Sequence, residues 1–213
     1  MSLCCLLMKK RIKLKFEQFV FRCIEKYRLR IISSNNNPFG IDFAEGAKIK
    51  DPLRIEGGQY IKIGSNCSIG RMAWIAAYDK YSEQKFNPQI IIGEDVTIGN
   101  LACITSIDSI KIGKGCLFSE YVYISDHAHG VQPNLNLYPA SQDLYSKGPV
   151  VIGENTFLGF RVCILPGVEL GNNCVVGANS VVTKSFPANC MIAGIPGKLI
   201  KKYSFEKNEW IAI

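Results

Sequence analysis

The 213-residue sequence contains no run of about 18 apolar residues, the length that a membrane-spanning helix requires. It also lacks the pattern of a secretory signal peptide, because the apolar stretch MSLCCLL is short and its basic residues follow it rather than precede it. We therefore expect a cytoplasmic protein. A hydrophobic content of 47% and a charged content of 20% are typical of a globular domain with a real core.

The nine cysteines include no CxxC pair. Zinc sites use such close, paired spacing, and an odd number of scattered cysteines does not suit a disulfide framework. We interpret the cysteines as reduced, structural thiols.

Outside the N-terminus, the sequence has no excess of positive charge. Residues 1–30 contain nine Lys or Arg and two Glu, which accounts for the whole net charge of +7, and the remaining 183 residues carry sixteen charges of each sign. Nucleic-acid binding by the body of the protein is therefore not expected.

The basic segment also carries apolar residues at helical spacing, namely Ile12, Phe16, Phe19, Val20, Cys23, Ile24, Tyr27 and Ile31. This pattern predicts a basic amphipathic helical segment over residues 1–37. Such a segment could lie on an anionic membrane through residues 9–31, or it could pack on the rest of the chain and cover open strand edges. The residues alone leave both alternatives open.

An aliphatic residue, usually followed by Gly or Ala, recurs every six positions through the body of the chain. One series contains Ile63, Ile69 and Ile75, and further series run from Ile92 to Ile124 and from Ile152 to Val182. A period of six with β-branched residues predicts a parallel β-helix in which the aliphatic side chains point inward. With three sides to a coil, residues 63–187 predict about five to seven coils. Small residues predict a second inward position: Cys67, Thr97, Ala102, Cys116, Thr156, Val162, Cys174 and Ser180.

Three interruptions break this repeat, near Tyr78–Gln89, Ser106–Ser109 and Gly130–Gly148. Loops on a rigid scaffold commonly carry function, so these interruptions are candidate sites. The predicted organisation is the N-terminal segment, a β-helix domain over residues 38–190 with an inserted loop at 130–148, and a C-terminal extension over residues 191–213.

The stretch ISDHAHG, residues 124–130, contains the only two histidines, His127 and His129, beside Asp126. Histidine can take and return a proton near neutral pH. The repeat assigns Ile124 and Ala128 to inward positions, so both imidazoles are expected to project outward. Because neighbouring side chains diverge along an extended strand, the sequence leaves open whether Asp126 orients an imidazole.

Residues 148–202, GPVVIGENTFLGFRVCILPGVELGNNCVVGANSVVTKSFPANCMIAGIPGKLIKK, resemble the hexapeptide-repeat acetyltransferases that act on sugars and bacterial polysaccharides. The motif DHAHG, followed by a loop that ends in SKGPV, strengthens the resemblance to polysaccharide O-acetyltransferases. The resemblance implies a left-handed β-helix that forms a homotrimer, with acetyl-CoA as the acetyl donor in clefts between subunits.

The resemblance also implies residues that bind the coenzyme. The run GANSVVTK suggests Ala178, Thr183 and Lys184 along the pantetheine and phosphate arms. The run GIPGKLIKK suggests Lys198 and Lys201 near the nucleotide phosphates, where cations suit the charge of coenzyme A.

In the run TFLGF, Phe157 stands where the family usually has Trp before the cofactor-facing turn, so the indole N–H is missing. Gly159 forms that turn. The backbone N–H of Phe160 corresponds to the family's donor to the thioester oxyanion.

For the histidines, the expected role is proton transfer. A sugar hydroxyl is a weak nucleophile whereas a thioester is already activated, so the missing component is a base near the hydroxyl. By resemblance, His127 is expected to be that base and His129 to shape the pocket, with direct attack in a ternary complex.

No metal is expected, because the zinc-binding carbonic anhydrases of this fold use three histidines and this chain has two. Cysteine catalysis is not expected either, since no cysteine is near the motif in sequence. Two alternatives stay open: N-acetylation of an amino sugar, and a non-catalytic β-helix that serves assembly. The acceptor itself cannot be read from the loop at 130–148.

Overall fold

The computed structural model describes residues 15–20, 22, 37–133 and 136–213. The chain divides into two compact units, residues 1–37 and 38–213. In the first unit, residues 15–20 and 22 are helical, and the rest of the predicted amphipathic segment lies outside the described residues. Among the described residues, no helix is long and apolar enough to cross a membrane.

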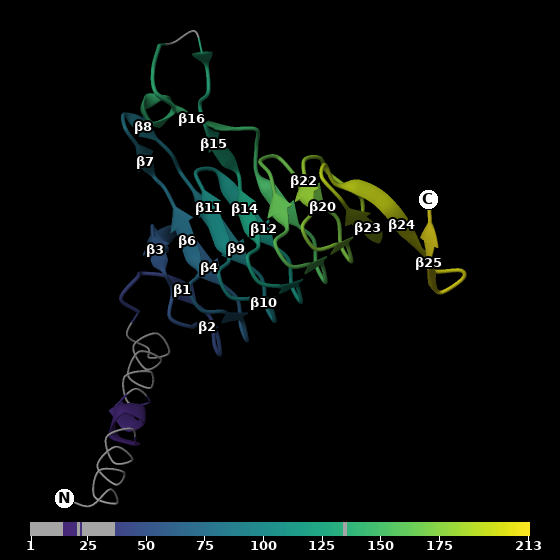
Figure 1. Cartoon of the computed structure of the whole chain (residues 1–213), viewed down its shortest axis with the longest axis horizontal. Helices are drawn as coiled ribbons and strands as arrows, with labels where there is room; N and C mark the ends of the chain where they lie inside the picture. Colours follow the sequence, from purple (N-terminus) through teal and green to yellow (C-terminus); the bar gives the residue numbers. More distant parts are fainter. Residues whose placement is uncertain (1–14, 21, 23–36, 134–135) are drawn as a thin grey trace, which may run out of the picture. The chain divides into compact units, whose positions relative to one another are not determined.

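The second unit is a column of stacked triangular coils, each made of three short strands (Figure 1). Strands of successive coils pair in parallel, so each side of the triangle is a parallel sheet. We name these sheets A, B and C in the order in which the chain visits them. This architecture confirms the β-helix that the period of six predicts.

Sheet A contains β1 (Asp42–Phe43), β4 (Ile61–Ile63), β9 (Gln89–Ile92), β12 (Ser109–Ile112), β17 (Val150–Ile152) and β20 (Glu169–Leu170). Sheet B begins with β2 (Lys48–Ile49), β5 (Ser68–Ile69), β10 (Thr97–Ile98), β13 (Leu117–Phe118), β18 (Phe157–Leu158) and β21 (Val175–Val176). Sheet C contains β3 (Arg54–Glu56), β6 (Trp74–Ala77), β11 (Cys103–Ser106), β14 (Tyr123–Ser125), β19 (Cys163–Ile164) and β22 (Val181–Val182). A short 3-10 helix, η1 (Gly58–Tyr60), leads into β4.

Beyond β22, sheet B continues through β23 (Cys190–Ala193), which is parallel to β21. Two antiparallel strands, β24 (Lys198–Ser204) and β25 (Glu209–Ala212), then complete this sheet. The segment predicted as a C-terminal extension therefore pairs with the end of the column.

The core consists of the aliphatic residues of the repeat and of Phe118, which occupies one of the same positions. Those residues are at most 2% exposed: Ile63, Ile69, Ile75, Ile92, Ile98, Ile104, Ile112, Phe118, Ile124, Ile152, Leu158, Ile164, Leu170, Val176 and Val182. Each lies above its counterpart in the next coil, as Ile75, Ile104 and Ile124 do in sheet C. The predicted inward positions are confirmed, and burial of this apolar surface holds the coils together.

The second inward position needs one correction. Thr97 is exposed, and the preceding residue, Val96, is the buried one. The assignment of Thr97 was wrong because that position is five rather than four residues after Ile92. The three thiols of this position are buried and unpaired with another cysteine: Cys67, Cys116 and Cys174.

Glycine at the corners allows the backbones of neighbouring coils to approach closely. A Cβ atom at Gly153 would lie 2.5 Å from the backbone nitrogen of Asn172, so any larger residue would force the coils apart. The same corner holds Asn155 and Asn173 at positive φ, a conformation that asparagine tolerates better than most residues.

The interruptions of the repeat differ in kind. The first forms a hairpin of β7 (Lys80–Tyr81) and β8 (Gln84–Lys85). The second is not a projecting loop, because β11 and β12 are joined by only Ile107 and Asp108.

The third interruption begins at Asp126 rather than at Gly130. It contains β15 (His127–His129), antiparallel to β16 (Leu144–Ser146), and the 3-10 helix η3 (Pro139–Ser141). Both hairpins extend from the same end of sheet C (Figure 1).

Candidate active site

A cavity of about 660 Å³ lies where the two hairpins leave sheet C. Its floor is the outward face of that sheet, where Arg54, Trp74, Cys103 and Tyr123 stand in one row of paired strands. The hairpins form its walls, and the lining there comprises Tyr78, Lys80, Tyr81, His127, Ala128, His129 and Leu144. Both predicted histidines therefore face one pocket.

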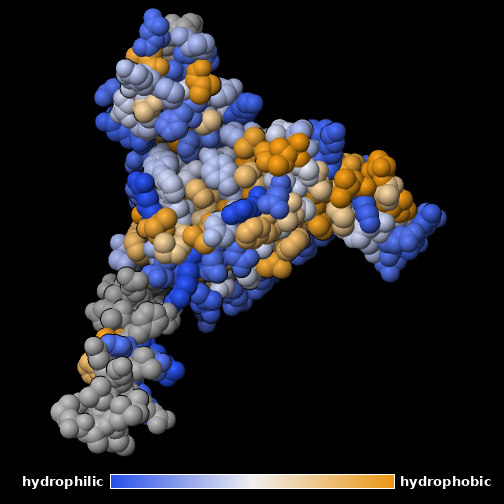
Figure 2. All heavy atoms as spheres, in the orientation of Figure 1, coloured by the Kyte–Doolittle hydropathy of each residue, from blue (hydrophilic) through white to orange (hydrophobic). Residues whose placement is uncertain are grey.

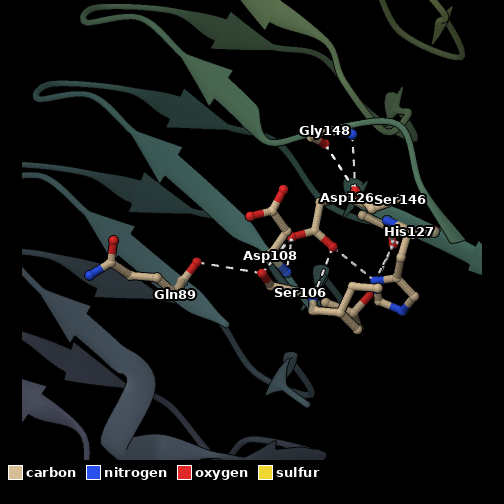
Figure 3. A network of polar contacts seen from close by, with 10 residues as sticks. Gln89, Ser106, Asp108, Asp126, His127, Ser146 and Gly148 are labelled. Atoms are coloured by element: carbon tan, nitrogen blue, oxygen red, sulfur yellow. Dashed lines mark hydrogen bonds and ion pairs between the residues drawn. The ribbon is translucent and has the colours of Figure 1, made fainter. Parts of the chain in front are cut away.

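The carboxylate of Asp126 is the centre of a buried polar network (Figure 3). Its Oδ2 accepts hydrogen bonds from Ser106 Oγ at 2.5 Å and from the backbone nitrogen of Asp108 at 3.0 Å. Its Oδ1 accepts from the backbone nitrogen of Ile107 at 2.9 Å and lies 2.9 Å from His127 Nδ1. The tight turn between β11 and β12 thus provides an anion site for this carboxylate.

Burial by itself would raise the pKa of Asp126. The hydrogen bonds from His127, Ser106, Ile107 and Asp108 outweigh burial, so that the pKa lies below its ordinary value. Asp126 is therefore ionised at neutral pH despite being fully buried.

The ionised carboxylate decides which nitrogen of His127 carries a proton. A carboxylate only accepts hydrogen bonds, so Nδ1 is the protonated nitrogen in the neutral ring. Nε2 then keeps its lone pair. The side chain of His127 is only 11% exposed, and its ring meets that of Tyr78 edge to face at a centroid distance of 6.1 Å. His127 is a fixed imidazole with a basic nitrogen in the pocket.

Further contacts hold the start of β15 in place. Ser125 Oγ donates to the carbonyl oxygen of His127 at 2.9 Å, and Ser146 Oγ donates to the carbonyl oxygen of Asp126 at 2.6 Å. Ser146 Oγ also accepts from the backbone nitrogen of Gly148 at 3.0 Å (Figure 3).

The sequence left the role of Asp126 open, and the structure places its carboxylate in contact with the imidazole. The rule of diverging side chains fails here because the chain leaves sheet C at Asp126 and changes direction. For the same reason the expected inward position of Ala128 was wrong. Ala128 is exposed and lines the pocket, since β15 pairs with β16 and not with the column.

His129 has a looser environment than His127. It is exposed, its Nδ1 lies 3.4 Å from Tyr81 Oη, and the two rings meet edge to face at 5.3 Å. The structure thus keeps both imidazoles in one pocket but fixes only His127 through a buried charge.

One cysteine lies closer to the motif than the sequence suggested. Cys103 lines the same pocket as His127, because β11 pairs with β14 and places it beside Tyr123. Burial raises the pKa of its thiol, so the thiol stays protonated and is a poor nucleophile.

The residues that the resemblance assigns to the coenzyme lie on the last two coils and on β24. Phe157 and Phe160 are exposed at β18 and the turn after it. The turn packs closely on the next coil, since a Cβ atom at Gly159 would lie 2.7 Å from the backbone nitrogen of Ala178. These four residues are therefore neighbours along one corner.

The predicted cationic residues occupy a second location. Thr183 and Lys184 follow β22 and are exposed, with Lys184 Nζ 5.7 Å from the ring centroid of Phe186. Lys198 and Lys201 lie on β24. The backbone nitrogen of Gly197, next to Lys198, donates to the carbonyl oxygen of Val181 on β22 at 2.7 Å. β22 thus links these two groups of cations.

The sequence did not predict a cation beside Phe160, at the corner that also contains Phe157, Gly159 and Ala178. The guanidinium of Arg161 lies 5.2 Å from the ring centroid of Phe160 and 5.3 Å from that of Tyr121. It also missed the pocket residues of β3, β6 and β7, which lie 46 or more positions before His127. The aromatic residues among them gave no local signal, because only the stacking of coils brings them to the histidines.

The residues that the structure describes contain no group of three or more His, Cys, Asp or Glu side chains that could hold a metal ion.

Comparison with known proteins places these features in a family. Residues 89–119 and 149–184 match the model for the hexapeptide repeat of succinyl-transferase. The chain is 36% identical over 168 residues to WbbJ of Escherichia coli K12, named as a lipopolysaccharide biosynthesis O-acetyl transferase, covering 76% of this chain and 82% of that protein. It is 32% identical over 135 residues to the galactoside O-acetyltransferase of the same organism, covering 63% of each.

A solved structure supports the fold. A serine-to-cysteine mutant of AntD, an N-acyltransferase from Bacillus cereus solved with dTDP-4-amino-4,6-dideoxyglucose and coenzyme A, superposes with a TM-score of 0.65 at 18% identity. The match covers 79% of this chain and 87% of AntD. The repeat, the three parallel sheets and these relatives identify the column as a left-handed parallel β-helix. The chain belongs to the hexapeptide-repeat acetyltransferase family, among relatives named as sugar and lipopolysaccharide O-acetyltransferases.

Proposed function

We propose that this protein transfers an acetyl group from acetyl-CoA to a hydroxyl of a sugar or polysaccharide precursor. The observation that carries the proposal is the imidazole of His127, which lines the pocket with Nδ1 bound to the buried Asp126 carboxylate. The names of the Escherichia coli relatives support a carbohydrate hydroxyl as the acceptor.

In this mechanism, acetyl-CoA supplies an acyl carbon that is already activated as a thioester. His127 Nε2 accepts the proton of the acceptor hydroxyl while the hydroxyl oxygen attacks that carbon. The resulting imidazolium is stabilised by Asp126, and it returns the proton to the sulfur as the carbon–sulfur bond breaks. Oxygen thus gains the acetyl group and coenzyme A leaves as a thiol, without an acyl-enzyme.

The composition of the pocket suits a sugar ring. Four aromatic residues line it: Trp74, Tyr78, Tyr81 and Tyr123. Such side chains combine an apolar face, against which the C–H groups of a pyranose can pack, with N–H or O–H groups that bind hydroxyls. A volume of about 660 Å³ lies within the range of pockets that hold small organic ligands.

The predicted donor residues also have suitable chemistry. Lys184, Lys198 and Lys201 provide positive charge for the phosphates of coenzyme A. His127 belongs to the hairpin after β14, whose partner strand β19 lies in the same coil as Phe157. Transfer requires the thioester carbon of the donor to lie within reach of the hydroxyl that His127 deprotonates.

We further propose a homotrimer, as the family resemblance implies. Exposed apolar side chains form a stripe along sheet B and its corner with sheet C: Met72, Leu101, Leu117, Tyr121, Phe157 and Phe160. Figure 2 shows apolar patches on the surface of the column. A second copy of the chain packed against this stripe would remove it from water.

The test is acetyl transfer by the purified protein to a panel of neutral sugars, uronic acids and amino sugars, with the product identified by mass spectrometry and NMR. We expect an O-acetyl ester that mild base removes. An amide formed only with amino sugars would favour N-acetylation instead. Absence of both acetyl-CoA binding and transfer would contradict the proposed function.

A further inference from the structure

The side chain of Gln84 joins the two hairpins beside the pocket. Gln84 on β8 and Leu144 on β16 are 60 positions apart, yet Gln84 Nε2 donates to the carbonyl oxygen of Leu144 at 3.1 Å. In return, the backbone nitrogen of Leu144 donates to Gln84 Oε1 at 2.7 Å. The amide group thus pairs with β16 as the backbone of a neighbouring strand would.

A second pair of contacts lies beside the first. Tyr81 Oη donates to the carbonyl oxygen of Ala140 at 2.6 Å and contacts His129 Nδ1 at 3.4 Å. His129 is the register partner of Leu144, so the contact of Tyr81 with His129 and the hydrogen bonds of Gln84 act on the same point of the β15–β16 hairpin. We call Tyr81, Gln84, His129 and Leu144 the hairpin clasp.

The clasp holds a loop that is also tied internally. Gln142 is 4% exposed, and its Oε1 accepts from the backbone nitrogen of Gln132 at 2.7 Å. Its Nε2 donates to the carbonyl oxygen of Leu137 at 3.0 Å. Gln142 thus ties parts of the β15–β16 insertion to one another, and the clasp fixes the insertion against β7–β8.

Three of the four clasp residues, Tyr81, His129 and Leu144, line the pocket, while Gln84 lies behind them. In the part of the chain that the structure describes, the residues assigned to the donor lie on other coils and make no hydrogen bond with the clasp. We propose that the hairpin clasp is the acceptor-recognition element of the enzyme, with Gln84 as a positioning residue that sets the distance between the pocket walls. This inference rests on the proposed function.

Gln84 offers an informative series of variants. In Gln84→Ala both hydrogen bonds to Leu144 are lost. In Gln84→Glu the carboxylate can still accept from the nitrogen of Leu144, but it faces the carbonyl oxygen without a proton to donate. Glu83→Gln is the matched control, because Glu83 is an exposed neighbour on the same hairpin.

The first measurement is steady-state kinetics with two acceptors of different size. We expect Gln84→Ala to raise the acceptor KM about tenfold, which is the scale of losing the two hydrogen bonds that position the pocket wall. The ratio of kcat/KM between the two acceptors should also change. The acceptor KM of Gln84→Glu should lie between the values for Gln84→Ala and Glu83→Gln. The KM for acetyl-CoA should stay within about twofold of wild type, since its residues lie on other coils.

The second measurement is hydrogen exchange at the Leu144 amide in the full chain. Gln84→Ala should exchange at least about tenfold faster there, because the amide loses its acceptor, and Glu83→Gln should match wild type. Unchanged exchange would disprove the clasp. Faster exchange with an unchanged acceptor KM and specificity ratio would overturn the recognition role, as would equal losses for donor and acceptor. If wild type acetylates no sugar, the proposed function fails while exchange still reports on the clasp.

Discussion

His127 and His129 stand two residues apart on β15, but their surroundings differ. His127 contacts a buried carboxylate and is nearly enclosed, whereas His129 is exposed and touches only Tyr81 among its polar contacts in the described structure. A general base must be held within about 3 Å of its target, so the enclosed imidazole is better suited to that role. We therefore expect the two histidines to contribute unequally to catalysis.

We predict that His127→Ala lowers kcat by about 100-fold or more, the usual scale for losing a general base. His129→Ala should cost less and act partly through the acceptor KM, because this side chain shapes the pocket wall. The affinity for acetyl-CoA, measured by calorimetry, should barely change in either variant. Near-normal turnover of His127→Ala would refute the assignment, and normal turnover of both would leave the motif without a catalytic role.

Asp126 gives a prediction on stability. Asp126→Asn should lower the free energy of unfolding at pH 7 by about 2 kcal/mol, because both buried carboxylate oxygens accept hydrogen bonds, whereas the amide keeps one acceptor oxygen and places an NH2 group against the remaining donors. Its pKa is lowered in the folded state, so this stabilisation is present above pH 3.8, the ordinary value, and is lost as the pH falls through the lowered pKa.

In urea unfolding experiments, the difference in the free energy of unfolding between wild type and Asp126→Asn should therefore become smaller as the pH falls below about 3.8. Asp42→Asn, at an exposed position of β1, is the control and should match wild type throughout. A difference that stays constant down to pH 2 would show that the charge of Asp126 contributes nothing.

At the scale of elements, the coils depend on small side chains at the corner between sheets A and B. The thiol of Cys116 donates to the carbonyl oxygen of Gly153 in the next coil at 3.2 Å, and Cys67 makes the same contact with Gly93 at 2.9 Å. These thiols join successive coils while filling the inward position. They are structural, as the spacing of the cysteines predicted.

Burial raises the pKa of the Cys116 thiol to about 11. In the unfolded chain the thiol ionises near 9.0, so between pH 9 and 11 the unfolded state binds fewer protons and stability falls as the pH rises. We predict that Cys116→Ser is less stable than wild type at pH 8 but loses less stability between pH 9 and 11. Parallel pH dependences in urea unfolding would contradict this linkage.

At the scale of the whole molecule, the apolar stripe on sheet B predicts self-association. Light scattering should give the mass of a trimer for wild type at working concentration. Leu117→Lys should dissociate it, because this exposed residue pairs with Phe157 in the middle of the stripe. Phe205→Lys, at an exposed position between β24 and β25, is the control and should stay trimeric. A stable wild-type monomer would rule out both the trimer and donor sites between subunits.

The basic segment over residues 1–37 poses a second question at this scale, namely whether residues 9–31 bind a membrane or pack on the protein. We expect packing, so the full chain and a chain that begins at Pro38 should both stay in the supernatant after sedimentation with anionic liposomes. Pelleting of the full chain alone would support membrane contact, and it should weaken at high salt.

The sequence by itself determined the column. A period of six specifies which side chains are buried in every coil, so the core, the coil boundaries and the positions of Cys67, Cys116 and Cys174 could be predicted from local spacing. It also singled out the histidine motif, because two imidazoles beside an acid are rare in this chain.

The tertiary structure alone decided the geometry of the site. The pairing of Asp126 with His127 arises because the chain leaves sheet C and the turn at Ile107 and Asp108, a coil away, binds the carboxylate. The placement of Ala128 and the union of Gln84 with Leu144 depend on antiparallel hairpins outside the column. Periodicity describes residues that repeat along one column, and it carries no information about contacts between two insertions that lie far apart in the chain.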